Sequence, residues 1–186
     1  KSRGLKLISL NVERDRHLDS RVIPFLKKQQ PDVVCLQEVF EVDFKRLVNV
    51  LGMAGSFVPM MRQPTARKDR HDEWFASGLG IFSRFPDSCM RAEFYFGQAD
   101  DPPQKIRGET KESVWTWDQN TVKKMVLWAR IRKNDVPFTI ATTHFTWSSE
   151  GMADANQRRD SARLLEILAG FEDIVFSGDM NAPRGG

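Results

Sequence analysis

Short, largely apolar runs that end in polar residues recur along this chain, and they limit its fold more than any other feature. The runs at 7–10, 33–36, 140–143 and 174–177 lead into Asn11, Gln37-Glu38, His144 and Gly178-Asp179-Met180-Asn181. Runs of this length that are bounded by turn residues are typical of buried β-strands. The sequence therefore predicts strands that carry polar side chains at their carboxyl ends.

The remaining patterns add helices, a hairpin and loops. Strands are expected at 5–12, 32–39, 78–84, 91–96 and 173–177, after Gly55 as a short strand, and as a hairpin at 124–132 and 137–145. Helices are expected at 19–30, 43–51 and 153–170. Residues 61–75 lack periodicity and are expected to form an exposed loop, and the irregular residues 98–120 are expected to form a long loop with at most one short strand. Helices flanking a block of hairpin-connected strands favour one α+β domain over residues 1–186, with mixed sheets.

The last helix is amphipathic in the sequence, and its pattern predicts which face is buried. The inward positions are expected to be Ala155, Ala162, Leu165 and Leu168. The outward positions are expected to be Arg158, Arg159, Asp160, Arg163 and Glu166.

The composition is that of a globular protein. Of the 186 residues, 40% are hydrophobic and 28% charged, and 13 Phe and 5 Trp supply large core side chains. The net charge of +3 and pI near 9.0 permit an anionic substrate without requiring one. Cys35 and Cys89 lack metal-ligand spacing and are expected to be small buried hydrophobes.

Targeting signals are not evident in the given sequence. It contains no run of about 18 apolar residues, so no transmembrane segment is expected. The opening Lys1–Gly4 leads straight into a strand pattern and not into the apolar region of a signal peptide, which favours a cytoplasmic location.

The polar strand ends point to a specific chemistry. Glu38 and Asp179 offer carboxylate oxygens, which suit Mg²⁺ because this ion takes one or two protein carboxylates and leaves its other positions to water and phosphate. If the strand ends meet at one edge of the sheets, they form a single polar cleft. The sequence therefore predicts phosphoester chemistry.

The motifs resemble those of the endonuclease/exonuclease/phosphatase superfamily in order and approximate separation. The resemblance runs from Leu5 to Pro183 and rests on Leu10-Asn11-Val12, Leu36-Gln37-Glu38-Val39, Gly78–Arg84, Thr143-His144-Phe145 and Gly178–Pro183. It implies a four-layer α/β sandwich of two facing mixed sheets with helices outside and a cleft along one edge. Each motif alone is common, and the ordered set is specific.

The same resemblance implies a role for each site residue. Glu38 would hold Mg²⁺, with Mn²⁺ as an alternative, and Asn11 would lie beside it. Asp179 would orient or deprotonate the attacking water, and Asn181 would fix Asp179 and the phosphate. His144 would donate to a non-bridging phosphate oxygen. Such an arrangement neutralises the charge that develops during in-line attack on a phosphodiester.

One family feature has no counterpart in these 186 residues. Relatives carry a closing Ser-Asp-His motif on a late strand, whereas the histidines here are His17, His71 and His144. We therefore expect the given chain to be the front part of a longer protein, to lack the last strands of the fold and to show little hydrolysis by itself.

Simpler explanations compete with these roles. Asn11, Asp179 and Asn181 are also turn formers, and His144 shares its strand face with apolar residues, as a core histidine would. Trp115, Trp117 and Trp147 are more often packing residues than platforms for a base or a headgroup. The basic residues Arg62, Arg67, Lys68 and Arg70 form either a phosphate-tracking loop or a solvated one. Glu73 is a candidate acid partner for His144.

The function that these observations favour is a Mg²⁺-dependent phosphodiesterase whose partner is a phosphodiester substrate, most plausibly nucleic acid. A sphingomyelinase-like or inositol-phosphatase-like enzyme would use the same residues with different loops. A binding module that keeps the fold without turnover is the alternative from another class, motivated by the missing motif.

Overall fold

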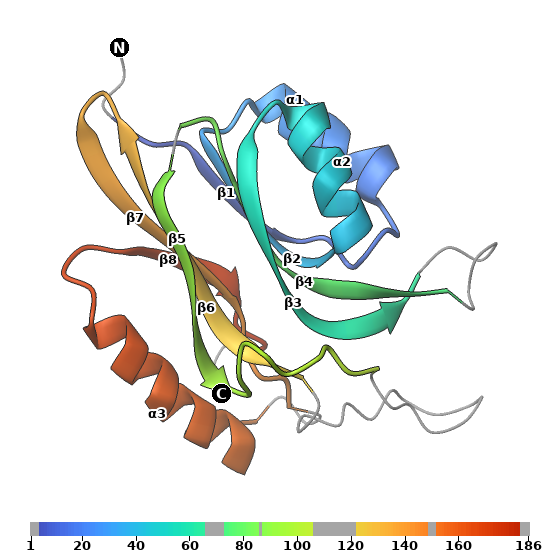
Figure 1. The fold of residues 1–186 in the computed structure, drawn as a ribbon, viewed down its shortest axis with the longest axis vertical. Helices are drawn as coiled ribbons and strands as arrows, with labels where there is room; N and C mark the ends of the chain where they lie inside the picture. Colours follow the sequence, from blue (N-terminus) through green and yellow to red (C-terminus); the bar gives the residue numbers. More distant parts are fainter. Residues whose placement is uncertain (1–3, 66–72, 86, 106–121, 149–151, 183–186) are drawn as a thin grey trace.

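A computed structural model describes residues 4–65, 73–85, 87–105, 122–148 and 152–182. Its strands form two four-stranded sheets that pack face to face (Figure 1). The first sheet comprises β1 (Leu7–Asn11), β2 (Val33–Phe40), β3 (Ala54–Pro64) and β4 (Trp74–Ser83) in the order β1-β2-β4-β3. β1 and β2 are parallel, and the other pairs are antiparallel.

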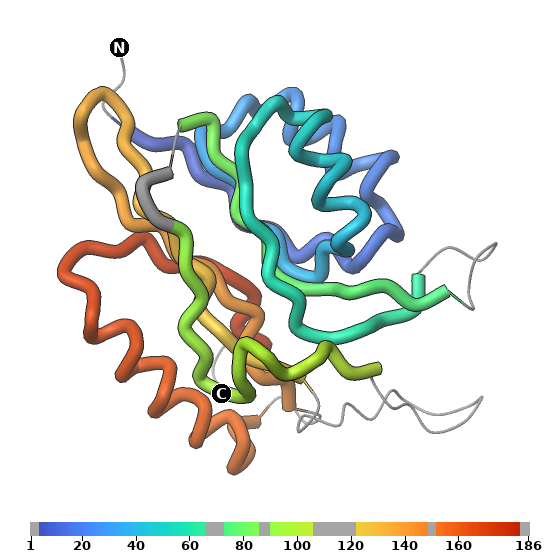
Figure 2. The backbone as a smooth tube through the Cα atoms, in the orientation of Figure 1, coloured from blue at the N-terminus to red at the C-terminus, as the bar shows by residue number. Residues whose placement is uncertain are grey.

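The second sheet repeats this mixed pattern. It comprises β5 (Asp87–Phe96), β6 (Lys124–Lys133), β7 (Val136–His144) and β8 (Val175–Asp179) in the order β5-β6-β7-β8. β7 and β8 are parallel, while β5, β6 and β7 pair antiparallel. Where the two sheets meet, β1 lies next to β8 (Figure 2).

Helices cover the outer faces of both sheets. The π-helix η1 (Leu18–Val22), α1 (Ile23–Gln29) and α2 (Glu41–Leu51) lie on the first sheet, and α3 (Ala155–Ala169) lies on the second (Figure 1). Three apolar clusters separate these layers. One lies between the sheets around Leu79 and Leu127, one under α1 and α2 around Leu26, and one under α3 around Trp128. The expected α+β sandwich with helices outside is confirmed.

The long hairpin of β3 and β4 corrects one expectation. Residues 61–64 and 74–75 were expected in an exposed loop, and the strand after Gly55 was expected to be short, yet β3 spans 11 residues. Backbone pairing continues from Met61↔Ser77 to Pro64↔Trp74 beyond a bulge, and Met61 is fully buried. Pairing in register with β4, which apolar periodicity does not reveal, extends the strand here.

The buried face of α3 also differs from the expectation. Asp160 is 1% exposed and Leu165 is 65% exposed, the reverse of the predicted orientation. Leu164, Ile167 and Leu168 pack on the second sheet, while Asp160 accepts a 2.6 Å hydrogen bond from the Thr146 hydroxyl. The helix is rotated because the loop after β7 presents polar groups that need buried partners.

The remaining expectations have mixed outcomes. Cys35 is buried with a free thiol, as expected. Residues 98–105 contribute only an isolated bridge between Arg62 and Lys105, and residues 106–120, with Trp115 and Trp117, lie outside the described residues. No helix in the described part of the chain is long and apolar enough to cross a membrane.

Candidate active site

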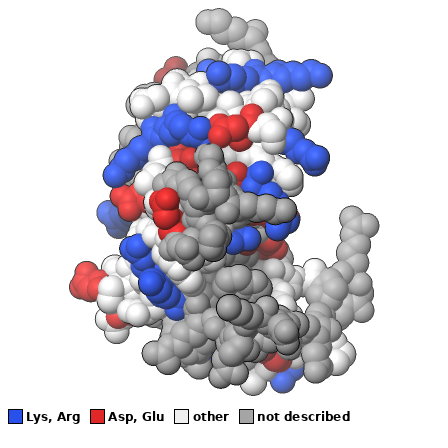
Figure 3. All heavy atoms as spheres, turned by 90° about the vertical axis from the view of Figure 1, so that its right-hand side faces the viewer, with Lys and Arg blue, Asp and Glu red and all other residues white. Residues whose placement is uncertain are grey.

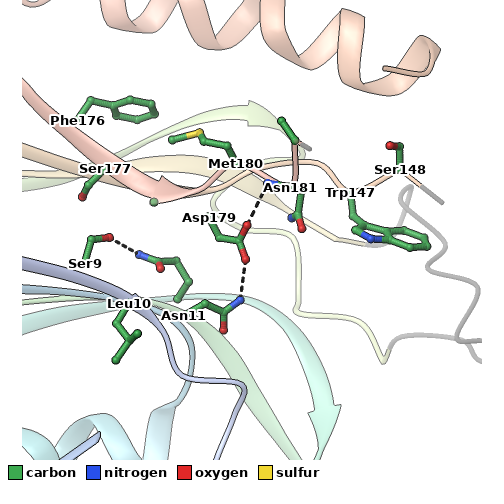
Figure 4. A pocket seen from close by; sticks show the side chains of 13 residues that line it. Ser9, Leu10, Asn11, Trp147, Ser148, Phe176, Ser177, Asp179, Met180 and Asn181 are labelled. Atoms are coloured by element: carbon green, nitrogen blue, oxygen red, sulfur yellow. Dashed lines mark hydrogen bonds between the residues drawn. The ribbon is translucent and has the colours of Figure 1, made fainter. Parts of the chain in front are cut away.

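Four strand ends meet at one edge of the two sheets. Because β1 runs parallel to β2 and β7 parallel to β8, the carboxyl ends of each pair point the same way. The register places Asn11 beside Gln37 and His144 beside Asp179. Contact between β1 and β8 then joins the two pairs into one site (Figure 4).

Asn11 links the two carboxylates of the site. Its side-chain nitrogen donates to Glu38 Oε1 at 3.0 Å and to Asp179 Oδ2 at 2.9 Å. Its side-chain oxygen accepts the backbone N–H of Glu13 at 2.9 Å, which is an Asx turn. One side chain thus forms the Asx turn with its oxygen and contacts both carboxylates with its nitrogen.

Glu38 lies at an irregular point of β2. The pairing of β2 with β4 shifts register between Leu36 and Val39, and Glu38 itself has a φ of 58°. A left-handed backbone is uncommon for a residue other than glycine and redirects the side chain out of the regular strand alternation. Burial raises the pKa of Glu38, against the opposing effects of the Asn11 hydrogen bond and the Arg14 charge.

Asp179 is held by its backbone neighbours. Burial acts to raise its pKa, but hydrogen bonds from Asn11 and from the backbone N–H of Asn181 outweigh burial and lower the pKa overall. The preceding Gly178 has a φ of 149°, and a Cβ there would lie 2.1 Å from the carbonyl oxygen of Thr143. Only glycine allows β8 to approach β7 this closely, which sets the position of Asp179.

His144 lies against both carboxylates. Its Nε2 is 3.9 Å from Glu38 Oε1 and 3.9 Å from Asp179 Oδ2, and the residue is 3% exposed. Burial, followed by the charge of Lys124, lowers the pKa of His144 to about 3, so the ring is neutral at pH 7. Its buried Nδ1 has no hydrogen-bond partner among the described residues, unlike a histidine that only completes a core.

Asn181 links the ends of β7 and β8 next to Asp179. Its side chain donates to the carbonyl oxygen of Phe145 at 2.8 Å, and the Phe145 N–H donates to the carbonyl oxygen of Asp179 at 2.8 Å. These bonds tie the ends of β7 and β8 together. The structure thus brings all five predicted residues to one edge: Asn11, Glu38, His144, Asp179 and Asn181.

A cleft of about 970 Å³ opens beside these strand ends. Its wall includes Asn11, Asp179 and Asn181 together with Trp147, whose ring lies near Asn181 (Figure 4). A volume of this size accommodates a ligand of several ring systems.

The structure does not place Glu73 or Arg62 in the site. Glu73 is exposed, and the carboxylates that approach His144 among the described residues are those of Glu38 and Asp179. Arg62 donates to the carbonyl oxygen of Trp74 at 2.7 Å, which is a structural role. Arg67, Lys68, Arg70 and His71 lie outside the described residues.

Three buried polar residues near the site were assigned no role from the sequence. Gln37 donates to Thr142 of the opposite sheet at 2.9 Å. Gln157 of α3 donates to the carbonyl oxygens of Thr146 and Asn181 at 2.7 Å and 3.3 Å. Lys124 lies at the start of β6 with 3% exposure. The signal for Lys124 was available, since Val126 and Trp128 make the second face of β6 apolar as well.

The donor set suits a hard divalent cation better than zinc. No group of three or more His, Cys, Asp and Glu side chains suited to an ion occurs within the described ranges. Mg²⁺ requires only one or two protein carboxylates, which Glu38 and Asp179 provide. Asn11 currently points its nitrogen at both carboxylates, so it would have to turn its oxygen inward to become a ligand.

Fold and site define a phosphoesterase-type α/β sandwich, and comparison with known proteins gives the family. Residues 8–185 match the model of the Endonuclease/Exonuclease/phosphatase family, and the chain belongs to that family. Members of this family are hydrolases that act on phosphoesters.

Individual relatives share 30% or less of their aligned residues with this chain. Nocturnin of Drosophila melanogaster is 30% identical over 174 residues, which cover 89% of this chain and 24% of that protein. ANGEL2, a 2',3'-cyclic phosphatase, superimposes with a TM-score of 0.62 at 18% identity over 97% of this chain and 54% of its own. The mannosyl-6-phosphatase Bt3783 of Bacteroides thetaiotaomicron gives 0.62 at 13% identity over 98% of this chain and 67% of its own. The chain spans about a quarter of the curated relative's length.

Proposed function

We propose that this protein hydrolyses phosphodiesters with the help of Mg²⁺, in a nuclease-type reaction. The observation that carries the proposal is the pair of carboxylates from Glu38 and Asp179, bridged by Asn11 and facing the neutral, unpartnered ring of His144. Asn11 and Asp179 line the cleft, and Glu38 and His144 lie against them. Two carboxylates with a neutral amide and a neutral ring suit the binding of a cation and a phosphate together.

Glu38 is the proposed principal ligand of Mg²⁺, because a buried carboxylate with a raised pKa gains most from a nearby cation. Asn11 is the proposed second ligand after rotation of its amide. When bound, the ion would supply Lewis-acid stabilisation of charge on the phosphate oxygens.

Three other residues of the chain have proposed roles in the reaction. Asp179, whose lowered pKa keeps it ionised at neutral pH, is proposed to orient and deprotonate the attacking water. Asn181 fixes Asp179 through its N–H, and its amide is proposed to contact the phosphate. His144 is proposed to donate one ring N–H to a non-bridging oxygen, because a neutral imidazole still carries one donor.

Nucleic acid is the proposed substrate. Arg14 places a fixed positive charge beside Glu38, held by a 3.0 Å hydrogen bond to the Pro64 carbonyl oxygen. ANGEL2 has been solved with adenosine-2',3'-vanadate, a nucleotide-derived ligand. The face on the right of Figure 1 shows Lys and Arg interspersed with Asp and Glu among its described residues (Figure 3), so the proposal does not depend on a uniformly basic surface.

The test is a substrate panel with the longest natural form of the protein. DNA, RNA, bis-p-nitrophenyl phosphate and sphingomyelin are incubated with Mg²⁺, with Mn²⁺ and with a chelator. We expect turnover of a nucleic acid that the chelator abolishes and that Asp179→Asn lowers by roughly 10²- to 10³-fold. Undiminished turnover in chelator or in Asp179→Asn would refute the site. Turnover of sphingomyelin alone would change the substrate class, and none at all would favour a binding module.

A further inference from the structure

Lys124 is a buried ammonium next to the site that the proposed reaction does not use. Its Nζ lies 3.5 Å from the carbonyl oxygen of His144 and 3.4 Å from that of Phe145. It forms no ion pair within the described part of the protein. Burying an ammonium is costly unless opposite charges compensate it, so its presence here requires a reason.

Three carboxylates from three elements surround Lys124. Asp160 of α3, Glu38 of β2 and Asp179 of β8 all act on its charge. The ring of His144 of β7, on which the charge of Lys124 also acts, is neutral. Lys124 therefore adds a buried positive charge to a cluster that includes both site carboxylates, in which Arg14 acts on Glu38 and Arg159 pairs with Asp160.

We propose that Lys124 is a positioning residue of the active site, which anchors the His144–Phe145 backbone and supplies the positive charge that balances Glu38, Asp160 and Asp179. This inference rests on the proposed phosphoester hydrolysis and assigns a new residue to it.

The hydrogen bonds show how Lys124 reaches the reacting groups. The Phe145 carbonyl oxygen that faces Lys124 also accepts the side chain of Asn181, and the Phe145 N–H holds the carbonyl of Asp179. A shift of Phe145 would therefore displace His144, Asp179 and Asn181 together.

The segment that Lys124 contacts is also held from the side of α3. Asp160 accepts hydrogen bonds from the Thr146 hydroxyl at 2.6 Å and from Arg159 Nε at 2.7 Å. Asp160 thus connects α3 to the residue that follows Phe145, and Lys124 contacts the same segment from β6. The segment 144–146 is held between a cation and an anion.

The experiment separates charge from packing with three variants of the longest natural form. Lys124→Met keeps the length of the side chain and removes its charge, and Lys124→Arg keeps the charge. Lys123→Met is the matched control, because Lys123 is also buried and also binds carbonyl oxygens, those of Ala99 and Asp101, away from the site carboxylates. We measure kcat and KM on bis-p-nitrophenyl phosphate, the Kd for Mg²⁺ by titration calorimetry and the thermal midpoint.

Lys124→Met should lower kcat by roughly 10- to 100-fold with little change in KM, because His144, Asp179 and Asn181 lose the anchor that holds them in the reactive geometry. It should also bind Mg²⁺ about 3-fold more tightly, because a repelling cation is gone. Lys124→Arg should stay within about 5-fold of the wild-type kcat, and Lys123→Met should match the wild type in kcat and Mg²⁺ affinity.

A purely structural role would weaken Mg²⁺ binding and turnover together with the thermal midpoint in Lys124→Met, and that result would overturn the inference. A kcat equal to that of an active wild type would overturn it as well. If the wild type itself hydrolyses no phosphoester, the proposed function fails, and the direction of the Mg²⁺ change in Lys124→Met still decides the role of Lys124.

Discussion

Asn11 and Asp179, which are 168 positions apart in the sequence, are joined by a 2.9 Å hydrogen bond from the side-chain amide of one to the carboxylate of the other. The bond crosses from β1 of the first sheet to β8 of the second. The same amide also binds Glu38 Oε1 at 3.0 Å. Asn11 therefore lies between the two carboxylates of the site and donates to both.

This relationship predicts how Asn11→Ala responds to metal. Without the amide, two carboxylates face each other without a donor, which destabilises the folded state by about 1–3 kcal/mol. We expect a lower thermal midpoint in chelator and a smaller rise on adding Mg²⁺ than in the wild type, because the variant lacks one proposed ligand of the ion. Scanning calorimetry with and without Mg²⁺ measures both quantities. Equal Mg²⁺-induced shifts in the two proteins would contradict the metal site.

Glu38→Gln tests the principal ligand directly. Loss of its charge should weaken Mg²⁺ binding at least about 10-fold, because the ion's main anionic contact is removed. Glu73→Gln is the matched control, since Glu73 is an exposed acid outside the carboxylate pair. Titration calorimetry on both variants decides the assignment. Equal affinities would move the metal site elsewhere.

The sequence predicted the convergence of the site because strand direction determines it. Parallel pairing of β1 with β2 and of β7 with β8 carries Glu38 and Asp179 to one edge, and both were recognisable as acids that end apolar runs. The sequence could not predict which atom of each side chain contacts which partner. Asn11 is predicted as a ligand beside Glu38, and that role stays a prediction; in the structure its oxygen accepts the Glu13 N–H and its nitrogen faces the carboxylates.

The surroundings of the site depend on tertiary packing that periodicity does not record. Lys124 lies on the face of β6 that α3 covers, and the apolar Val126 and Trp128 on that face are the signal of this cover in the sequence. Asp160 faces inward because the Thr146 hydroxyl beneath α3 needs a partner. Without such apolar neighbours, a polar residue that faces another element has the same sequence pattern as one that faces water.

The orientation of α3 gives a stability prediction with opposite outcomes for two positions. Asp160→Ala should lower the free energy of unfolding by about 1–3 kcal/mol, because it leaves the buried Thr146 hydroxyl and Arg159 without their acceptor. Leu165→Ala should change it by less than about 0.5 kcal/mol, since that side chain is 65% exposed. Urea unfolding of both variants measures the difference. The reverse order would restore the helix face that the sequence pattern favoured.

His144 predicts how stability depends on pH. Burial, together with the charge of Lys124, lowers the pKa of His144 from 6.5 to about 3 in the folded protein. The unfolded chain therefore binds the proton first as the pH falls, so the stabilisation is present above pH 6.5 and is lost as the pH approaches 3. Between pH 7 and pH 5, His144 alone should lower the free energy of unfolding by about 2 kcal/mol.

Urea unfolding at pH 7 and pH 5 in chelator isolates this contribution by comparing the wild type with His144→Gln. Glu38, with its raised pKa, adds stability as the pH falls, and Asp179, with its lowered pKa, removes it, but both carboxylates remain in the variant and cancel in the comparison to first order. We expect the variant to lose about 2 kcal/mol less than the wild type over this interval. Parallel pH dependences for the wild type and His144→Gln would show that His144 keeps its ordinary pKa in the fold and would contradict the lowering of its pKa by burial and Lys124.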